Sequence, residues 1–263
     1  MIYCTGKIRV RDGLMEHDIS FDTIETMRHI SLDARLTAAM ELAGRTDTFA
    51  DIGCDHGRLV CAMLQRGLCA RAIAADISAP SLEKAAKLSE HVGLSDQIEL
   101  RVGSGLSVLR KGEADTVAVL GMGGKLIAEL LSDCPVPLMG AKKAILQPMR
   151  GVEDLRSFLW ENGYRIEHDR VIEDGGRLYQ VMSVLPPDHA IGRDTLPAGF
   201  PEDCFTVGYR ALDEKDPLLK KLVSRELDQC TKRLREAMGT EGEARLMKKK
   251  RQCEQILSML DVF

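Results

Sequence analysis

The sequence predicts an α/β protein whose centre is a doubly wound, Rossmann-like sheet. Two observations carry this prediction: strand-like and helix-like runs alternate regularly through the middle of the chain, and a glycine-containing loop follows the first of these strands. The chain has 263 residues, of which 44% are hydrophobic and 29% are charged. It is therefore long enough for one well-buried α/β domain and an appendage.

Five short runs that are apolar or β-branched, and bounded by Gly, Pro or charge, are predicted to be strands: 48–53, 70–76, 97–102, 115–121 and 141–147. Helical patterns are predicted after them: 57–66, 80–91, 124–131 and 152–162. Pro80 stands near the first turn of its helix and Gly93 beyond the last, as helix caps prefer. Such a βαβ series predicts a parallel sheet with ligands at the carboxyl ends of its strands.

Residues 164–184 indicate two further strands, joined by a turn at Asp174-Gly175-Gly176. These strands are expected to pair in antiparallel fashion and to close the parallel sheet. A parallel sheet closed by an antiparallel hairpin is typical of class I methyltransferase domains rather than of dehydrogenases. Residues 31–184 are therefore predicted to form a methyltransferase domain with a core of its own.

The loop after the first strand reads Asp51-Ile52-Gly53-Cys54-Asp55-His56-Gly57, and the second strand ends on Asp76. Its glycines let the backbone turn sharply and approach a ligand, and an acid after the next strand can hold ribose hydroxyls. The spacing is not Gly-x-Gly-x-x-Gly, so no pyrophosphate cradle is indicated. The pattern suits S-adenosylmethionine, which has a ribose and a sulfonium but no phosphate. An ordinary glycine turn between strand and helix is an equally good interpretation of this loop alone.

The ends of the later strands carry further candidates. The third strand leads into Gly103-Ser104-Gly105, where a polar group can lie beside an adenine. The fourth leads into Met122-Gly123-Gly124, which is expected to be a loop with room for a flat base, and the fifth ends on Gln147-Pro148-Met149. Taken singly, the glycine loop is better explained as a helix start that needs close packing, and Gln147 is better explained as a simple strand end.

Composition limits the class of protein. No stretch approaches the ~18 apolar residues of a membrane span, and the N-terminus lacks a signal-peptide core. The eight cysteines include no Cys-x-x-Cys pair, and several lie in apolar runs, which favours reduced core thiols over disulfides or a metal site. A cytoplasmic protein without a bound metal is expected. The net charge of -4 gives no global attraction to nucleic acid, so an RNA-binding surface must be local.

The organisation changes after residue 184. Residues 185–210 contain four prolines and no clear period, which predicts an irregular linker. Residues 211–263 predict an antiparallel helical hairpin, a short coiled coil, because apolar residues recur at steps of three and four. The apolar residues of its two arms are Val223, Leu227, Cys230, Leu234 and Met238, then Leu246, Cys253, Leu257 and Leu260. Thr240 and Glu243 are predicted to form a capping box at the start of the second arm.

The outer faces of this hairpin are predicted to be basic. The residues concerned are Lys220, Lys221, Arg225, Lys232, Arg233, Arg235, Arg245, Lys248, Lys249, Lys250 and Arg251. Acidic residues are interspersed among them, so a solvated coiled-coil surface and an RNA-binding face are equally well supported.

In combination, these segments resemble the bacterial tRNA (adenine-22-N1) methyltransferases, often called the TrmK family. The matching stretches, in family order between about residues 31 and 184, are Leu32-Asp33-Ala34-Arg35-Leu36, the loop at 50–56, the strand at 72–76, Gly103-Ser104-Gly105-Leu106, Gly121-Met122-Gly123-Gly124, Ile145-Leu146-Gln147-Pro148 and Leu155-Arg156. The resemblance implies S-adenosylmethionine as the methyl donor and N1 of an adenine in the tRNA D-arm region as the acceptor.

Three positions depart from the family pattern. Ser104 stands where the family usually has Asp, Met149 where it usually has Asn, and Arg58 where an aromatic residue is common. Family members also commonly begin a few residues before the Leu-x-x-Arg-Leu helix. Residues 1–30 are therefore expected to be an extension of unknown role, with Met27 as a candidate start.

The resemblance assigns site residues on both sides of the reaction. The cofactor-binding candidates are Asp51, Gly53, Asp55, His56, Gly57, Asp76, Ile77, Gly103 and Ser104. Within this set, Asp51 and Asp55 are assigned to the methionine end, Asp76 to the ribose and Ser104 to the adenine, while His56 is expected to fix the loop. The candidates that face the target base are Gly121, Met122, Gly123, Gln147 and Asp33. Arg35 is expected to close over the cofactor, to contact RNA or to form an ordinary surface ion pair with Asp33.

Two other function classes remain open on the sequence. The first is a methyltransferase with a different acceptor, and the second is a non-catalytic RNA-binding protein of the same fold. Binding of S-adenosylmethionine separates the second class from an enzyme, since a binding module has no need of the donor. The sequence indicates no oligomeric state.

Overall fold

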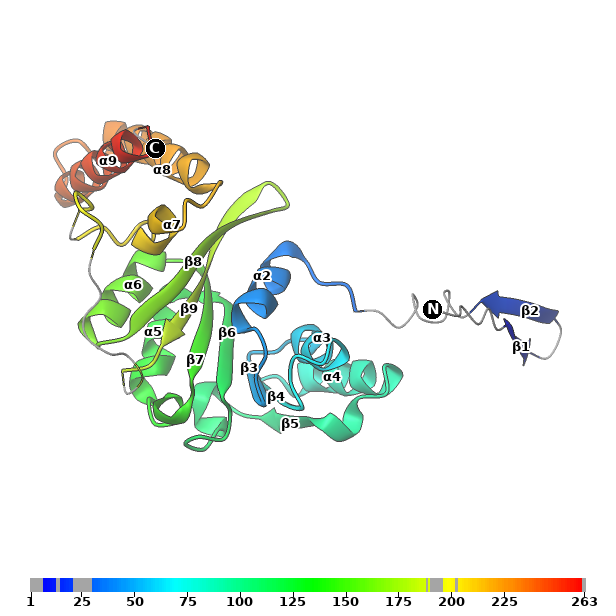
Figure 1. Cartoon of the computed structure of the whole chain (residues 1–263). Helices are drawn as coiled ribbons and strands as arrows, with labels where there is room; N and C mark the ends of the chain where they lie inside the picture. The colour runs from blue at the N-terminus through cyan, green and yellow to red at the C-terminus, as the bar shows by residue number, and fades with distance from the viewer. Residues whose placement is uncertain are drawn as a thin grey trace.

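The computed structural model of this chain describes residues 7–12, 15–20, 30–187, 189, 196–201 and 203–261. Its main sheet has the strand order β5-β4-β3-β6-β7-β9-β8 (Figure 1). The strands are β3 Thr48–Ile52, β4 Arg71–Asp76, β5 Ile98–Val102, β6 Thr116–Gly123, β7 Lys143–Arg150, β8 Arg165–Asp174 and β9 Arg177–Leu185. The predicted strands and the predicted hairpin are thus confirmed. A separate two-stranded sheet pairs β1 (Lys7–Asp12) with β2 (Met15–Ser20).

The order of the strands places a switch point between β3 and β6. Strands β3 to β7 are parallel to one another, whereas β9 pairs antiparallel with both β7 and β8. From β3 the chain builds outward through β4 to β5, and it then returns to the other side of β3 to form β6 and β7. In sheets of this kind, ligands bind outside the carboxyl ends of the strands, at the point where the order reverses.

Helices cover both faces of the sheet because successive strand residues point to opposite sides. Phe49 and Ala72 pack with α2, α3 and α4, whereas the adjacent Ala50 and Ile73 pack with α5 and α6. The helices are α2 Ala34–Ala43, α3 Arg58–Gln65, α4 Ala79–His91, α5 Gly124–Asp133 and α6 Val152–Glu161, and the short 3-10 helices are Ser95–Gln97, Gly105–Val108 and Leu138–Gly140. Each fully buried aliphatic side chain in these layers contributes roughly 1.5–3 kcal/mol.

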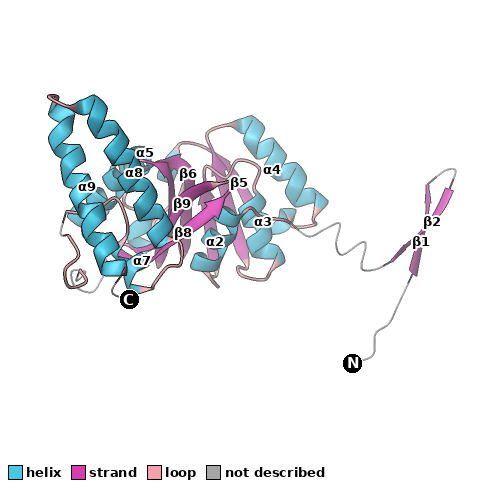
Figure 2. Cartoon of the chain, turned by 90° about the horizontal axis from the view of Figure 1, so that it is seen from above, coloured by secondary structure: helices cyan, strands magenta, loops and turns pink. Residues whose placement is uncertain are grey.

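The C-terminal hairpin is formed by α8 (Leu219–Ala237) and α9 (Glu241–Leu260), which lie side by side (Figures 1 and 2). Val223, Cys230 and Cys253 are buried, as the seam predicts, and Val223 and Cys253 join the hydrophobic cluster of the sheet. Met238 does not belong to the seam, because it follows the end of α8 and is 75% exposed.

The predicted capping box is wrong in its pairing. The Thr240 hydroxyl donates to the carbonyl of Ala237 at 2.7 Å instead of accepting from Glu243. The Glu243 carboxylate accepts from the backbone N–H of Gly239, one residue earlier than a capping box requires, at 2.7 Å. The tight turn at Gly239, which has φ +77°, brings its N–H to this position.

The segment expected to be a linker packs into the core where it is described. Phe200, Cys204 and Val207 are buried, and the short helix α7 (Tyr209–Asp213) follows them. These residues, together with residues of α8 and α9, belong to the same hydrophobic cluster as one face of the sheet. The cluster on the face covered by α2, α3 and α4 lies entirely within residues 30–181, whereas the cluster on the other face is shared with the C-terminal segments. The proline-rich composition marked the irregular backbone but gave no signal of its burial.

Arg156 of α6 holds this segment in place. Its guanidinium donates to the carbonyl of Phe205 at 3.0 Å and to the carboxylate of Asp169 at 2.6 Å, and both charged side chains are almost fully buried. Gln180 accepts from the same guanidinium at 2.7 Å and donates to the carbonyl of Thr206. Side chains of α6 and β9 thus satisfy the polar backbone of the segment, which would otherwise be costly to bury.

Lys249 is not part of an exposed basic face, contrary to the expectation for α9. Its ammonium lies 2.5 Å from Glu153 of α6 and 2.8 Å from Glu226 of α8. Burial alone would lower the pKa of Lys249, but these two carboxylates outweigh it and raise the pKa. Lys249 therefore anchors the helical hairpin to α6.

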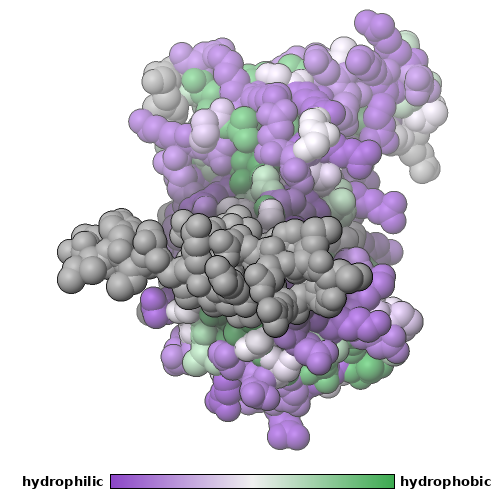
Figure 3. Space-filling model, turned by 90° about the vertical axis from the view of Figure 1, so that its right-hand side faces the viewer, coloured by the Kyte–Doolittle hydropathy of each residue, from purple (hydrophilic) through white to green (hydrophobic). Residues whose placement is uncertain are grey.

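The surface over α8 and α9 is mostly hydrophilic in the view of Figure 3, where these helices form the upper part of the molecule. Among the described residues, no helix is long and apolar enough to cross a membrane. The described side chains also contain no group of three or more His, Cys, Asp or Glu residues that could hold a metal ion.

Candidate functional site

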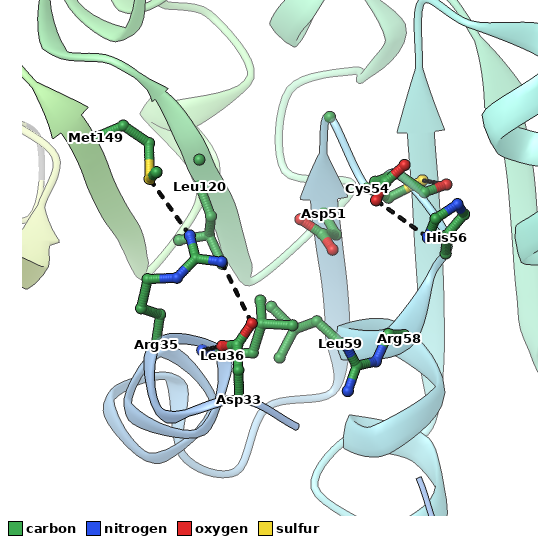
Figure 4. Close-up of a pocket in the computed structure, with 13 residues that line it drawn as sticks. Asp33, Arg35, Leu36, Asp51, Cys54, His56, Arg58, Leu59, Leu120 and Met149 are labelled. Carbon is green, nitrogen blue, oxygen red and sulfur yellow. Dashed lines mark hydrogen bonds and ion pairs between the residues drawn. The ribbon is translucent and has the colours of Figure 1, made fainter. Parts of the chain in front are cut away.

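An open pocket of about 410 Å³ lies at the switch point, outside the carboxyl ends of β3, β6 and β7 (Figure 4). One wall comes from the start of α2 and another from the loop between β3 and α3. Its lining residues are Asp33, Arg35, Leu36, Asp51, Gly53, Cys54, Asp55, His56, Arg58, Leu59, Leu120, Gly121 and Met149. The pocket therefore joins segments that are distant in the sequence.

The loop between β3 and α3 owes its shape to three residues with positive φ: Gly53 at +77°, Asp55 at +49° and Gly57 at +68°. The N–H of Gly53 donates to the carbonyl of Ala75 at 2.8 Å, which ties the loop to β4. A Cβ on Gly57 would lie 2.8 Å from the Cβ of Ala85 in α4, so only glycine fits there without a shift. The glycines predicted to shape this loop thus do so in the structure.

Asp76, at the end of β4, supports the same loop. Its Oδ2 accepts from the N–H of Asp55 at 3.0 Å, and its Oδ1 accepts from the N–H of Ser78 at 2.8 Å. Each carboxylate oxygen keeps a further lone pair for a hydroxyl group. Nδ1 of His56 lies 3.2 Å from a carboxylate oxygen of the adjacent Asp55, and the role of His56 in fixing the loop stays a prediction.

Asp51 is the buried acid of the pocket. Its side chain is 4% exposed and makes no hydrogen bond with a described residue. Burial, and next the charge of Asp76, raise the pKa of Asp51 to about 7. A cation placed against Asp51 would compensate both effects, so this part of the pocket favours a positively charged ligand group.

Cys54 lies beside these acids without becoming a nucleophile. Burial, followed by the charges of Asp51 and Asp76, raises the pKa of its thiol far above the ordinary value. The thiolate form is therefore negligible at neutral pH, and thiolate is the reactive species. The pocket provides no cysteine for covalent catalysis among its described residues.

Three further cofactor candidates, Ile77, Gly103 and Ser104, follow the ends of β4 and β5, beside the pocket lining. Ile77 and Val102 are 75% and 64% exposed, which is unusual for apolar residues at strand ends. Gly103 and Ser104 follow Val102, and a Cβ on Gly103 would lie 2.4 Å from a methyl group of Val108. An adenine ring resting on Ile77 and Val102 would cover them. Together with Asp51 and Asp76, these residues fit S-adenosylmethionine.

The base-facing segment differs from the predicted loop. Strand β6 continues through Gly121 and Met122 to Gly123, with irregular pairing to β7, and α5 begins at Gly124. The terminal methyl carbon of Met122 lies 2.3 Å from the position that a Cβ on Gly53 would take. A Cβ on Gly124 would lie 2.0 Å from the carbonyl oxygen of Gly151. Close packing against backbone thus accounts for Gly124, whereas Gly53 and Gly121 have positive φ values of +77° and +75°.

Gln147 lies beneath the pocket and is 1% exposed. Its Oε1 accepts from the backbone N–H of Gly121 and from Arg35, at 3.2 Å each. Its Nε2 donates to the carbonyl of Pro148 at 2.9 Å and lies 3.7 Å from the sulfur of Met149. The side chain therefore fixes the pocket floor. Its assignment as a base-facing residue stays a prediction.

Asp33 and Arg35 hold the α2 wall. Asp33 is the N-cap of α2, and its Oδ1 accepts from the N–H of Leu36 at 2.8 Å. Arg35 donates to the other Asp33 oxygen at 3.3 Å and to the sulfur of Met149 at 3.4 Å, as Figure 4 shows. Arg58 points away from these residues and donates to the carbonyl of Ser31.

The structure brings six of the predicted site residues into one pocket: Asp33, Asp51, Gly53, Asp55, His56 and Gly121. Arg35, for which the sequence left three roles open, and Met149, which was given no role, also line the pocket and contact each other. The sequence marked each of them, Arg35 by its place in the Leu-x-x-Arg-Leu segment and Met149 as a departure from the family pattern. Neither signal indicated that the two meet.

Comparisons with known proteins agree with this geometry. A family model described as a methyltransferase domain matches residues 32–182. The chain is 32% identical over 203 residues to the tRNA (adenine(22)-N(1))-methyltransferase of Bacillus subtilis, a match that covers 76% of this chain and 83% of that protein.

Solved structures show the same architecture. The crystal structure of the B. subtilis m1A22 tRNA methyltransferase TrmK superposes with a TM-score of 0.71 at 26% identity, covering 89% of this chain and 98% of that one. M. capricolum TrmK in complex with S-adenosyl-homocysteine has a TM-score of 0.67 at 23% identity, covering 89% and 99%, and supports the fold. The pocket at the switch point, the closing hairpin and these matches lead to one conclusion: this chain belongs to the family of tRNA (adenine(22)-N(1))-methyltransferases.

Proposed function

We propose that this protein transfers a methyl group from S-adenosylmethionine to N1 of adenine 22 in tRNA. The observation that carries the proposal is the shared pocket into which the cofactor loop, Gly121 and Met149 all open. Its family membership supports the same reaction. Because tRNA is the substrate, the reaction takes place in the cytoplasm.

The donor side of the site is formed by the loop at 53–57 and the ends of β3, β4 and β5. The Asp51 carboxylate faces the positively charged methionine end of the donor, and the Asp76 oxygens accept from the ribose hydroxyls. Ile77 and Val102 offer an apolar surface to the adenine, and Ser104 a hydroxyl group. When bound there, S-adenosylmethionine supplies a methyl group on a sulfonium, whose carbon–sulfur bond breaks as the carbon–nitrogen bond forms.

The acceptor side is formed by the start of α2 and the ends of β6 and β7. The N1 lone pair of adenine is free at neutral pH, so the site needs no general base. Its task is to hold N1 roughly 3–3.5 Å from the methyl carbon and in line with the breaking bond. Leu36, Leu120 and Met149 give the ring apolar contacts, while Asp33 and Asp51 lie where positive charge passes from sulfur to the base.

Access to N1 requires the base to leave the folded RNA, at a cost of a few kcal/mol. Contacts elsewhere on the tRNA must supply this free energy. The structure divides the basic residues of α8 and α9 into two groups. Lys220, Lys221, Lys248, Lys249 and Lys250 are engaged in ion pairs with described carboxylates.

The second group forms no ion pair with a described residue and consists of Lys232, Arg233, Arg235, Arg245 and Arg251. Arg225 belongs to neither group, because it has no ion pair with a described residue but donates to the carbonyl of Gly176. Three residues of the second group lie in the last turns of α8, toward the turn that joins it to α9. We infer that this group, and not the paired lysines, grips the phosphates of tRNA. Charge that is already neutralised by a neighbour has less to gain from a phosphate.

Incubation of the full-length protein with bulk tRNA and isotope-labelled donor tests the proposal, with mass spectrometry of the tRNA nucleosides as the readout. The proposal expects label in 1-methyladenosine. Label in another nucleoside, or only in protein or small molecules added in parallel, would show a methyltransferase with a different acceptor. Absence of donor binding by calorimetry would instead indicate a non-catalytic RNA-binding protein.

A further inference from the structure

The tip of the β8–β9 hairpin, residues 173–176, stands between the C-terminal helices and the pocket wall (Figure 1). On its outer side it is held by α8. The ammonium of Lys221 donates to both carboxylate oxygens of Glu173, at 2.6 and 2.7 Å, and Arg225 donates to the carbonyl of Gly176 at 3.3 Å. The tip is therefore fastened to the helical hairpin at two points.

On its inner side, the same tip holds Arg35 of α2. Oδ2 of Asp174 lies 3.7 Å from Nε of Arg35. The guanidinium also lies over the ring of Tyr179 in β9, 5.2 Å from the ring centre. An ion pair and a cation–π contact thus orient Arg35 from the hairpin.

The remaining nitrogens of Arg35 reach into the pocket. Nη1 donates to Oε1 of Gln147 at 3.2 Å and to the sulfur of Met149 at 3.4 Å. The Gln147 oxygen in turn accepts from the N–H of Gly121. One planar guanidinium therefore connects the hairpin tip, the end of β7 and, through Gln147, the end of β6. A lysine ammonium at position 35 lacks the fork that makes these contacts at once.

We propose that Arg35 and Asp174 are positioning residues for methyl transfer. Asp174 orients the guanidinium of Arg35, and Arg35 in turn fixes the positions of the Gln147 and Met149 side chains at the pocket. Helix α8 holds the hairpin tip in place through Lys221 and Arg225. This inference rests on the proposed function and adds the residues that align its acceptor side. The same contacts connect the helical hairpin, which is proposed to bind tRNA, to the pocket through the β8–β9 tip and Arg35.

The expected effect is on turnover rather than on stability. The side chains of Arg35 and Asp174 are 24% and 35% exposed, and partly exposed ion pairs contribute little to folding. A misplacement of about 1 Å at a reacting centre, however, can lower a rate by about 100-fold. Donor binding depends on the loop at 53–57 and on Asp76, which this network does not touch.

A double-mutant cycle in the full-length protein tests the proposal, with kcat and KM measured for a tRNA transcript and donor affinity measured by calorimetry. Asp174→Asn keeps the shape of the side chain and removes its charge, and it should lower kcat about tenfold with donor affinity within about twofold. Arg35→Ala should lower kcat at least as much, and Arg35→Lys should fail to rescue it. In the Arg35→Ala background, Asp174→Asn should have no further effect.

The brace on α8 has a matched control. Lys221→Ala removes the ion pair with Glu173 and should lower kcat about threefold. Lys220→Ala removes an ion pair of the same length, 2.6 Å, between the adjacent lysine and Asp261, and it should leave kcat unchanged. Equal effects of the two variants would contradict a role for the tip.

Additive losses in the double mutant would overturn the proposal, because Asp174 would then act independently of Arg35. A loss of donor affinity or a large fall in melting temperature in the single variants would also overturn it, since the residues would then be structural. The wild-type rate in the same series separates the two proposals. A wild-type protein that binds donor but never methylates tRNA would overturn the proposed function, and this inference with it.

Discussion

On the donor side of the pocket the backbone of one short loop sets the geometry, whereas on the acceptor side the side chains of distant segments meet at Arg35. The donor loop needs positive φ at Gly53, Asp55 and Gly57 and is tied to β4 by backbone hydrogen bonds. The acceptor side depends instead on hydrogen bonds between side chains, those of Arg35, Gln147 and Met149. Substitutions on the donor side should therefore affect folding and donor binding, and those on the acceptor side should affect turnover.

The largest effect is expected from Gly57→Ala on the donor side. The new Cβ combines the strain of a positive φ with a 2.8 Å contact to Ala85, and the two together should destabilise the fold by about 3 kcal/mol. Gly67→Ala, at the other end of α3, is the matched control, because Gly67 has φ +63° but open space. It should cost only about 1–2 kcal/mol. Urea unfolding of both variants measures the difference, and equal effects would show that contact with α4 is unimportant.

The next effect concerns donor affinity. Asp76→Ala removes a charged acceptor of the ribose hydroxyls, worth roughly 1.5–3 kcal/mol, and should weaken binding roughly 10- to 100-fold. Asp76→Asn keeps one oxygen that can accept from the Asp55 N–H, and should have a smaller effect. Calorimetry with S-adenosylmethionine measures both. If Asp76→Ala binds the donor as tightly as the wild type, the donor site lies elsewhere.

A third effect is a pH dependence of donor binding that arises from Asp51. Its carboxyl group has a pKa of about 7, so it is mostly neutral at pH 6 and mostly charged at pH 8. Because the donor is positively charged, affinity should rise about tenfold between these two pH values, with one proton released on binding at pH 6. Asp51→Asn should remove both the pH dependence and the proton release.

The same pKa shift predicts the stability of the free protein. The folded-state pKa of Asp51 is higher than the unfolded value, so its contribution to stability is present at acidic pH and is lost as pH rises toward 7. Asp51→Asn should therefore raise the melting temperature of the donor-free protein at pH 8. A lower melting temperature at pH 8 would contradict a destabilising charge at this position.

The smallest effect is expected on the binding of the acceptor tRNA by α8. Arg233→Gln with Arg235→Gln should raise the Kd for tRNA about threefold and reduce the salt slope of log affinity by roughly 0.7–0.9 for each phosphate that is no longer neutralised. Donor affinity should not change. Lys248→Gln is the control, because Lys248 already pairs with Asp203 at 2.7 Å. The Kd for tRNA is measured for all variants across a series of salt concentrations. A larger effect of the Lys248 control would contradict the proposal that the unpaired basic residues bind the phosphates.

The sequence predicted the shape of the loop at 53–57 well because its determinants are local. Gly53 and Gly57 restrict the backbone within one loop, and Asp76 follows the next strand at the spacing that a βα unit requires. The strand bounds were predicted to within a few residues for the same reason. The continuation of β6 to Gly123 was missed, since pairing with β7 overrides the weak strand propensity of glycine.

The acceptor side and the C-terminal region depend on tertiary contacts that no local pattern encodes. Arg35 meets Asp174 from a distant part of the chain. Lys249 has the appearance of a surface lysine in the helical period of α9, and only the approach of Glu153 makes it an anchor. Likewise, the segment around Phe205 is buried because Arg156 satisfies its backbone, which composition could not indicate.

The most direct test of the proposed function is position-resolved methylation of two tRNA transcripts that differ only in adenine or guanine at position 22. The full-length protein is incubated with each transcript and labelled donor, and the nuclease fragments are analysed by mass spectrometry. The proposed function predicts label as 1-methyladenosine in the fragment that contains adenine 22, and none in the guanine transcript. Label of equal amount in both transcripts, or in a fragment without position 22, would contradict it.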